Sequence, residues 1–132
     1  MIKLFIFIII FTLFFIIDIF TRFLKCKNSN LKILLLIFFH RLFYTFIYYA
    51  WIFDNKIILI LCLFLIIFTY IHWYFNNWKC KQTEIENNIC NYDKYMNFDY
   101  FYIIFNEKIA DLIINSYFII TLCIILYKLF KN

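Results

Sequence analysis

A histidine, a thiol and a carboxylate follow one another where an apolar run passes into the most polar segment of this sequence. They are His72, Cys80 and Glu86. Residues of these types can activate a thiol or move protons, so the segment could support thiol or acid–base chemistry. A metal site is not expected, because Cys80 and Cys90 are ten positions apart and the chain has neither a C-x-x-C pair nor an H-E-x-x-H motif. No cofactor is predicted.

A second group of polar residues interrupts long apolar runs. Asp18, His40 and Arg41 lie inside such runs, and Asp111 lies near the start of the last one. Ionisable groups in apolar segments can line a path for protons or small solutes, which makes conduction one hypothesis for the first three. For His40 and His72, a hydrogen bond inside a helix bundle or at a helix end is the simpler interpretation. Asp111 suits the positive end of a helix dipole without any site.

Composition indicates that these groups belong to a membrane protein. Of the 132 residues, 67% are hydrophobic and 16% are charged, whereas a soluble domain is about 45–50% apolar. The chain has no glycine, which excludes a P-loop, a Rossmann glycine turn and a G-x-S-x-G elbow. Its cations flank the apolar runs, which suits lipid headgroups as partners and predicts no nucleic-acid partner.

Four apolar runs have the length that a bilayer requires. They cover about residues 2–24, 33–53, 57–75 and 109–129, and a transmembrane helix needs roughly 20 residues. The first run lacks an A-x-A cleavage site, which favours a span over a signal peptide. We therefore expect an all-α, polytopic integral membrane protein in which residues 1–132 form a single domain. Residues 76–99 are its polar loop, and the tyrosine-rich residues 98–105 are expected to form a short interfacial helix before the last span.

The distribution of cations predicts an orientation. With four spans, the first and third loops share one side, and the second loop shares the other side with both ends of the chain. The first side carries eight cations: Arg22, Lys25, Lys27, Lys32, Lys79, Lys81, Lys94 and Lys108. The second side carries four: Lys3, Lys56, Lys128 and Lys131. The positive-inside rule then predicts that residues 76–99 are cytoplasmic.

Arg41 is the most costly residue of this arrangement. A charged side chain at the centre of a span costs about 2.5–3.5 kcal/mol on insertion scales. Asp18 lies in the neighbouring span at a depth that a long arginine can reach, so an Asp18–Arg41 ion pair between helices is predicted. Arg22 follows Asp18 by four positions and shares its helix face. The alternative is that Arg41 snorkels to the headgroups from a shorter span.

The five cysteines allow several interpretations. A Cys80–Cys90 disulfide requires an oxidising compartment, which the cation count opposes. Cys26 follows the first span and is a candidate for palmitoylation. Cys62 and Cys123 lie within spans, where a free cysteine behaves as a small hydrophobic residue.

Residues 71–90, IHWYFNNWKCKQTEIENNIC, resemble an uncharacterised family of small polytopic membrane proteins. Its bacterial members carry Cys-Pro-Leu-Thr and then Glu-Asn directly after a transmembrane helix, and hypothetical proteins of giant and other large DNA viruses are similar. The matching positions here are His72, Trp73, Asn76, Asn77, Cys80, Thr83, Glu86 and Asn87. His40 is similar to a histidine of the preceding span, whereas Lys81 and Gln82 replace the Pro and Leu. The resemblance covers about residues 33–105 and implies an architecture, not a reaction.

The same block also has a structural interpretation as a helix exit. Trp73 is expected to anchor at the headgroups, and Asn76 and Asn77 to end the third span in place of glycine, as Asn106 would end another helix. Thr83 and Glu86 have the T-x-x-E spacing of a capping box. Without glycine, the bundle must rely on large aromatic and isoleucine side chains and a few polar contacts.

Three functional hypotheses follow. The leading one is a non-enzymatic membrane component of a virus or organelle, located in a virion membrane or a host endomembrane, whose partners are the lipid bilayer and other membrane proteins. The second is a lipid- or thiol-acting enzyme that uses His72, Cys80 and Glu86. The third is a proton or small-solute conductor lined by Asp18, His40 and Arg41. The abundance of residues with AT-rich codons fits an AT-rich viral genome.

Overall fold

The computed structural model describes residues 1–91 and 104–131, and within these ranges every regular element is a helix. The elements are α1 (Ile2–Asp18), η1 (Ile19–Phe23), α2 (Leu31–Tyr49), η2 (Ala50–Ile52), α3 (Lys56–Phe75), α4 (Lys81–Cys90) and α6 (Glu107–Phe130). The expected interfacial helix at residues 98–105 falls largely outside the described residues.

Four helical segments are long and apolar enough to cross a membrane. They are Ile2–Phe23, Leu31–Ile52, Lys56–Phe75 and Lys108–Phe130. Their ends lie within two residues of the spans predicted from the sequence. The expectation of four helices of membrane-spanning length and composition is therefore confirmed for the described part of the chain.

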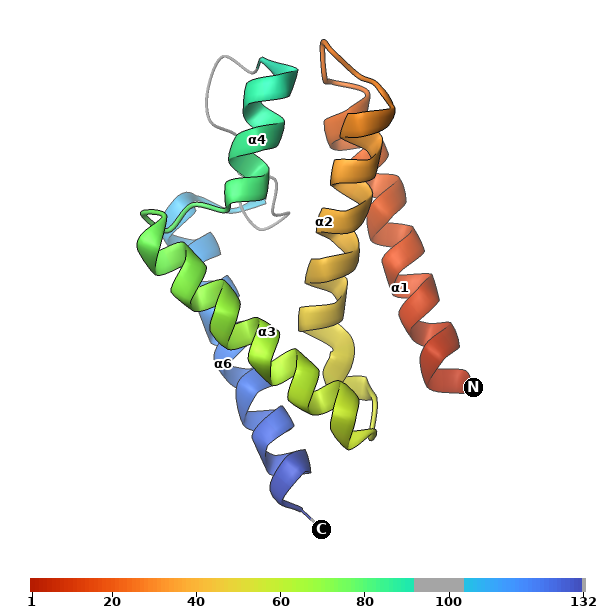
Figure 1. The fold of residues 1–132 in the computed structure, drawn as a ribbon, viewed down its shortest axis with the longest axis vertical. Helices are drawn as coiled ribbons and strands as arrows, with labels where there is room; N and C mark the ends of the chain where they lie inside the picture. Colours follow the sequence, from red (N-terminus) through yellow and green to blue (C-terminus); the bar gives the residue numbers. More distant parts are fainter. Residues whose placement is uncertain (92–103, 132) are drawn as a thin grey trace.

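The helices form a V rather than a closed bundle (Figure 1). Helix α1 packs along α2, and α3 packs along α6. Helices α2 and α3 meet at the short connection between them and diverge towards their other ends, where α4 lies close to α2 (Figure 1). The fold thereby turns one face of α2 and one face of α3 towards each other.

Asparagine side chains begin three of the long helices. The Oδ1 atoms of Asn30, Asn55 and Asn106 accept hydrogen bonds from backbone N–H groups of the first turns of α2, α3 and α6. These bonds satisfy donors that a helix start leaves unpaired. The Asn106 side chain caps the start of α6, and the helix that Asn106 is expected to end falls largely outside the described residues.

The end of α3 follows the sequence prediction. Asn76 is the last residue of its C-terminal turn, and Asn77 and Trp78 have φ angles of 50° and 59°. Asparagine tolerates this left-handed backbone better than most residues. The chain can therefore reverse towards α4 without a glycine.

Helix α1 ends in a wider π-helical turn, η1. Asp18 precedes this turn and Arg22 lies within it, and both side chains are buried. Turns of this kind displace side chains from their regular helical positions and are frequent at functional sites. Here the turn directs the Asp18 carboxylate towards α2 and the Arg22 guanidinium towards α2 and α4.

Most of the packing is aromatic and aliphatic, as the absence of glycine predicts. Phe118 of α6 contacts Tyr48, Tyr70 and Trp73 with ring centroids 5.2–5.7 Å apart. This ring cluster joins α2, α3 and α6. Trp73 is thus half-buried against α6 in the last turn of α3, and its expected role as a headgroup anchor stays a prediction.

Ion pairs and a disulfide distinguish the two ends of the molecule. Lys3 and Lys128 both pair with Asp54, so the start of α1, the α2–α3 connection and the end of α6 lie together. At the opposite end, Cys26 is bonded to Cys90 and the Asn28 side chain donates to the Ile89 carbonyl. The first loop and the segment after α3 therefore share one end, as a four-span topology requires.

Candidate functional site

Five ionisable side chains from three helices meet where α1, α2 and α4 converge. We call them the charged cluster: Asp18, Arg22, His40, Arg41 and Glu86. Asp18 and Glu86 are 0% exposed and Arg22 is 2% exposed. Two acids and two arginines balance one another, which fits the rule that buried charges are paired.

Arg22 is the centre of the charged cluster. Its Nε donates to Glu86 Oε1 over 2.9 Å and its terminal nitrogen donates to Glu86 Oε2, so the pair is bidentate. It also lies 3.5 Å from Asp18 Oδ1, four residues earlier. Burial raises the pKa of the Glu86 carboxyl, and the ion pair with Arg22 opposes that rise. One guanidinium therefore links α1 to α4.

The predicted Asp18–Arg41 ion pair is confirmed. Arg41 donates through Nε to Asp18 Oδ2 and through a terminal nitrogen to Asp18 Oδ1, the second over 2.9 Å. The Arg41 side chain is 11% exposed, and its guanidinium lies 5.6 Å from the centre of the Phe14 ring. Snorkelling is thus not its role here.

His40 connects the charged cluster to Cys80. Its Nδ1 lies 3.1 Å from a terminal nitrogen of Arg22, and its Nε2 lies 3.5 Å from Cys80 Sγ. Arginine can only donate, so Nδ1 accepts and the proton of the neutral ring is on Nε2, facing the sulfur. The arrangement fixes the orientation of the imidazole and points a donor at the Cys80 thiol.

The disulfide joins cysteines that sequence reasoning did not pair. Cys26 and Cys90 are bonded, whereas Cys80 is a free thiol. The Cys80–Cys90 alternative is wrong because the two residues lie at opposite ends of α4, about 15 Å apart at 1.5 Å per residue. Palmitoylation of Cys26 is incompatible with this bond.

The other matching residues of the 71–90 segment hold α4 and the turn between α3 and α4 in place through hydrogen bonds. The Asn76 side chain donates to the Lys79 carbonyl and to Glu84, and the first of these bonds is 2.7 Å long. The Asn76 hydrogen bond lowers the pKa of Glu84, with a further contribution from Lys81. Asn87 donates to the Thr83 carbonyl over 2.7 Å, and both residues are buried.

The predicted capping box of Thr83 and Glu86 is wrong. Helix α4 begins at Lys81 with Cys80 as its N-cap, so Thr83 and Glu86 lie within the helix. Their side chains are buried on the face that contacts α2. The Gln82 side chain strengthens this contact by donating to the Leu36 carbonyl over 3.0 Å. Asp111 is exposed near the start of α6.

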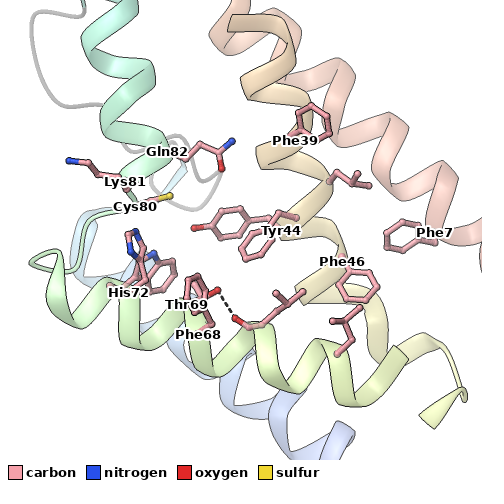
Figure 2. Close-up of a pocket in the computed structure, with 15 residues that line it drawn as sticks. Phe7, Phe39, Tyr44, Phe46, Phe68, Thr69, His72, Cys80, Lys81 and Gln82 are labelled. Carbon is pink, nitrogen blue, oxygen red and sulfur yellow. Dashed lines mark hydrogen bonds between the residues drawn. The ribbon is translucent and has the colours of Figure 1, made fainter. Parts of the chain in front are cut away.

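A cavity of about 790 Å³ lies between α2 and α3 and reaches Cys80. We call it the α2–α3 groove. Figure 2 shows Cys80, Lys81, Gln82 and His72 at one end, Tyr44 in the middle, and Phe46 towards the other end. Its walls are chiefly aromatic and leucine side chains. The groove thus combines an apolar interior with one polar end that contains a thiol.

Two functional features escaped sequence reasoning. The position of Arg22 indicates a cation of the first loop, and its i,i+4 spacing from Asp18 indicates a local ion pair. Neither pattern indicates that Glu86 is its partner. The groove left no pattern in the sequence, because it arises from the divergence of two helices. Among the described residues, no group of three or more His, Cys, Asp and Glu is arranged to hold a metal ion.

No family model, no curated protein and no solved structure matches this chain. The resemblance of residues 71–90 to a family of small membrane proteins therefore stays a prediction.

Proposed function

We propose that this chain is a non-enzymatic, multi-pass membrane protein that binds one membrane lipid in the α2–α3 groove. The acyl chain lies between α2 and α3, and the headgroup lies near His72, Lys81 and Gln82. The observation that carries the proposal is the groove itself, which is apolar along its length and polar at one end.

The dimensions of the groove suit an acyl chain. Leu61 and His72 both line it and are eleven residues apart on α3, which corresponds to about 16 Å of helix. One leaflet of a bilayer has a hydrocarbon thickness of about 15 Å, half of the whole core. The volume of 790 Å³ lies within the range of about 300–1,000 Å³ that is usual for ligand pockets.

A headgroup at the polar end would lie at the end of α3 but below the end of α2, because Cys80 contacts His40, the tenth residue of the Leu31–Ile52 span. His72 is in the last turn of α3, and Cys80 precedes the first turn of α4. A cation at this position is complementary to a lipid phosphate. Lys81 supplies one: its side chain is 62% exposed and pairs with Glu84 over 3.2 Å, a contact that a phosphate would replace or share.

The charged cluster supports a structural role beside the groove. It joins α1, α2 and α4 through ion pairs, and together with the disulfide it fixes α4 over the polar end. The hypotheses of a conductor and of an enzyme stay predictions. We do not favour a conductor, because the groove walls are apolar and because Asp18 and Arg41 pair with each other.

We infer further that the end of the molecule carrying Cys26 and Cys90 faces an oxidising compartment. Disulfides persist in such compartments and are reduced in the cytosol. The cation count predicts that this end is cytoplasmic, but a covalent bond between the first loop and the end of α4 is the more direct indication. Alkylation of free thiols in freshly prepared membranes, followed by reduction and a gel-shift label, measures the bonded fraction. Free Cys26 and Cys90 would refute this orientation.

Photocrosslinking tests the lipid site. The purified chain is reconstituted into phosphatidylcholine vesicles that contain a lipid with a photoreactive acyl chain, and the adducts are mapped by mass spectrometry. We expect adducts on groove residues such as Leu65 and Phe68. Leu61→Trp should reduce them at least fivefold, because Leu61 lines the groove.

Ile60→Trp is the matched control. Ile60 is the neighbouring residue on α3, is exposed to a similar extent (57% against 51% for Leu61) and does not line the groove. It should leave the adducts unchanged. Equal adduct yields for the two variants, or adducts spread evenly over the outer faces of all helices, would show that lipid contacts are unspecific.

A further inference from the structure

The free thiol at the polar end of the α2–α3 groove has the surroundings of a modification site. Cys80 lines the groove and is partly exposed, whereas Cys62 is buried against the α2 backbone and Cys123 lies on an exposed part of α6. Of the three, Cys80 is the cysteine that combines a position at the end of a span with access to an apolar cavity.

His40 gives this thiol a chemical partner. The imidazole is held by Arg22 through Nδ1 and faces the sulfur through Nε2 over 3.5 Å. A donor in that position stabilises negative charge on sulfur, and the thiolate is the nucleophilic form of cysteine. The burial of His40, at 6% exposed, keeps water from replacing this contact.

We propose that Cys80 carries a long-chain acyl group as a thioester, with the chain lying in the α2–α3 groove. The inference rests on the proposed function, because it takes the same groove and makes the bound chain covalent. Juxtamembrane cysteines are common sites of S-acylation. The groove adds a reason for this cysteine, since a chain attached at Cys80 can enter it directly.

The reaction is an acyl transfer without change of oxidation state. Cys80 Sγ attacks the carbonyl carbon of an activated acyl donor and forms the S–C bond. The bond between that carbon and the donor's leaving sulfur or oxygen breaks, and the thiol proton ends on the leaving group. The donor is a long-chain acyl-coenzyme A, which is a thioester and releases a thiol, or a glycerophospholipid, which is an oxygen ester and releases a lysolipid hydroxyl. Because acyl-coenzyme A is cytosolic, labelling by acyl-coenzyme A would contradict the orientation inferred from the Cys26–Cys90 bond, whereas labelling by the glycerophospholipid agrees with it. His40 acts as a positioning residue for the sulfur.

The experiment follows acylation of the purified full chain in phosphatidylcholine vesicles. One arm supplies alkyne-tagged palmitoyl-coenzyme A, and the other supplies phosphatidylcholine with the same tagged acyl chain. We expect a mass increase of one acyl group that hydroxylamine removes, in at least one arm. The arm that labels identifies the donor.

Matched variants locate the label. Cys80→Ser should lose at least 90% of it, whereas Cys62→Ser and Cys123→Ser should retain it. His40→Gln should slow labelling of Cys80 at least tenfold without lowering the yield of photoreactive lipid adducts in the groove. A histidine that only held the fold would lower both. Leu61→Trp should slow labelling by palmitoyl but not by acetyl donors, because a short chain does not need the groove.

Two results would overturn the proposal. One is the absence of hydroxylamine-sensitive label in both arms, and the other is a label that persists in Cys80→Ser. If photoreactive lipid still marks the groove in those cases, the noncovalent lipid site stands and the thioester is wrong. If the groove is not marked at all, the proposed function fails first.

Discussion

Removing the Arg22 guanidinium should destabilise the fold strongly at neutral pH. Arg22→Met leaves Glu86, which is 0% exposed, without its bidentate partner. At about 4 Å and an effective dielectric constant of about 20, the lost attraction is about 4 kcal/mol. Measurements on broken buried pairs give a similar cost of about 3–5 kcal/mol. We therefore expect a loss of about 4 kcal/mol in unfolding free energy.

The pH dependence of this variant has a definite sign. Burial already raises the pKa of Glu86, and Arg22 opposes that rise, so removing Arg22 raises the pKa further. A raised pKa means that the folded state binds more protons than the unfolded state, and stability then falls as pH rises. The defect of Arg22→Met should be largest above the raised pKa and should disappear as the pH falls below the ordinary range of a glutamate.

Equilibrium unfolding by SDS in mixed micelles, followed by tryptophan fluorescence, measures the effect. Arg22→Met/Glu86→Met should recover most of the loss, because the remaining Asp18–Arg41 pair is neutral and apolar replacements of a buried pair are often neutral or stabilising. Lys3→Met is the control for removing a cation from an exposed pair, which is worth about 0–1 kcal/mol. If Arg22→Met costs no more than Lys3→Met, or the double variant is no better than the single one, this reasoning is wrong.

Three other changes have expected outcomes in the same unfolding assay. Cys26→Ser opens a bond between residues 64 positions apart and should cost about 4 kcal/mol; equal stability in oxidised samples would contradict this. Phe118→Ala removes a ring that is 1% exposed and contacts three others, at about 3–5 kcal/mol; a smaller loss than at the exposed Phe64 would refute its central role. The hydrogen bond from Asn76 lowers the pKa of Glu84. The stability that the Glu84 carboxylate contributes is therefore present above the ordinary glutamate pKa and is lost as the pH falls through the lowered pKa. Glu84→Gln should weaken this loss of stability at acid pH, and an unchanged dependence of stability on pH would exclude Glu84 as its source.

The helices were predictable because membrane-spanning length and apolarity are properties of a continuous run. The Asp18–Arg41 pair was predictable for a related reason: a charge inside a span must have a partner, and few candidates exist. The end of α3 before Asn76 and Asn77 was predictable from the backbone preference of asparagine, whereas the left-handed φ angle of Trp78 was not.

The Arg22–Glu86 pair was not predictable, because both residues have convincing local explanations. Arg22 has an acid four residues earlier, and Glu86 has the spacing of a capping box. Their contact across 64 positions depends on α4 folding back onto α2, which no local pattern encodes. The Cys26–Cys90 bond depends on the same contact, and cysteine spacing does not determine connectivity.

The charged cluster has a consequence for the order of membrane insertion. Asp18 and Arg22 leave the ribosome together and neutralise each other within one helix. Arg41 then adds a positive charge that no further acid of the charged cluster balances until Glu86 is made, 45 residues later, which at about 5–20 residues per second takes a few seconds. During this interval the α1–α2 hairpin carries an excess cation at its α4-facing end. A nascent chain stalled before Glu86 should therefore be extracted from the membrane by alkaline carbonate more readily than one stalled after it.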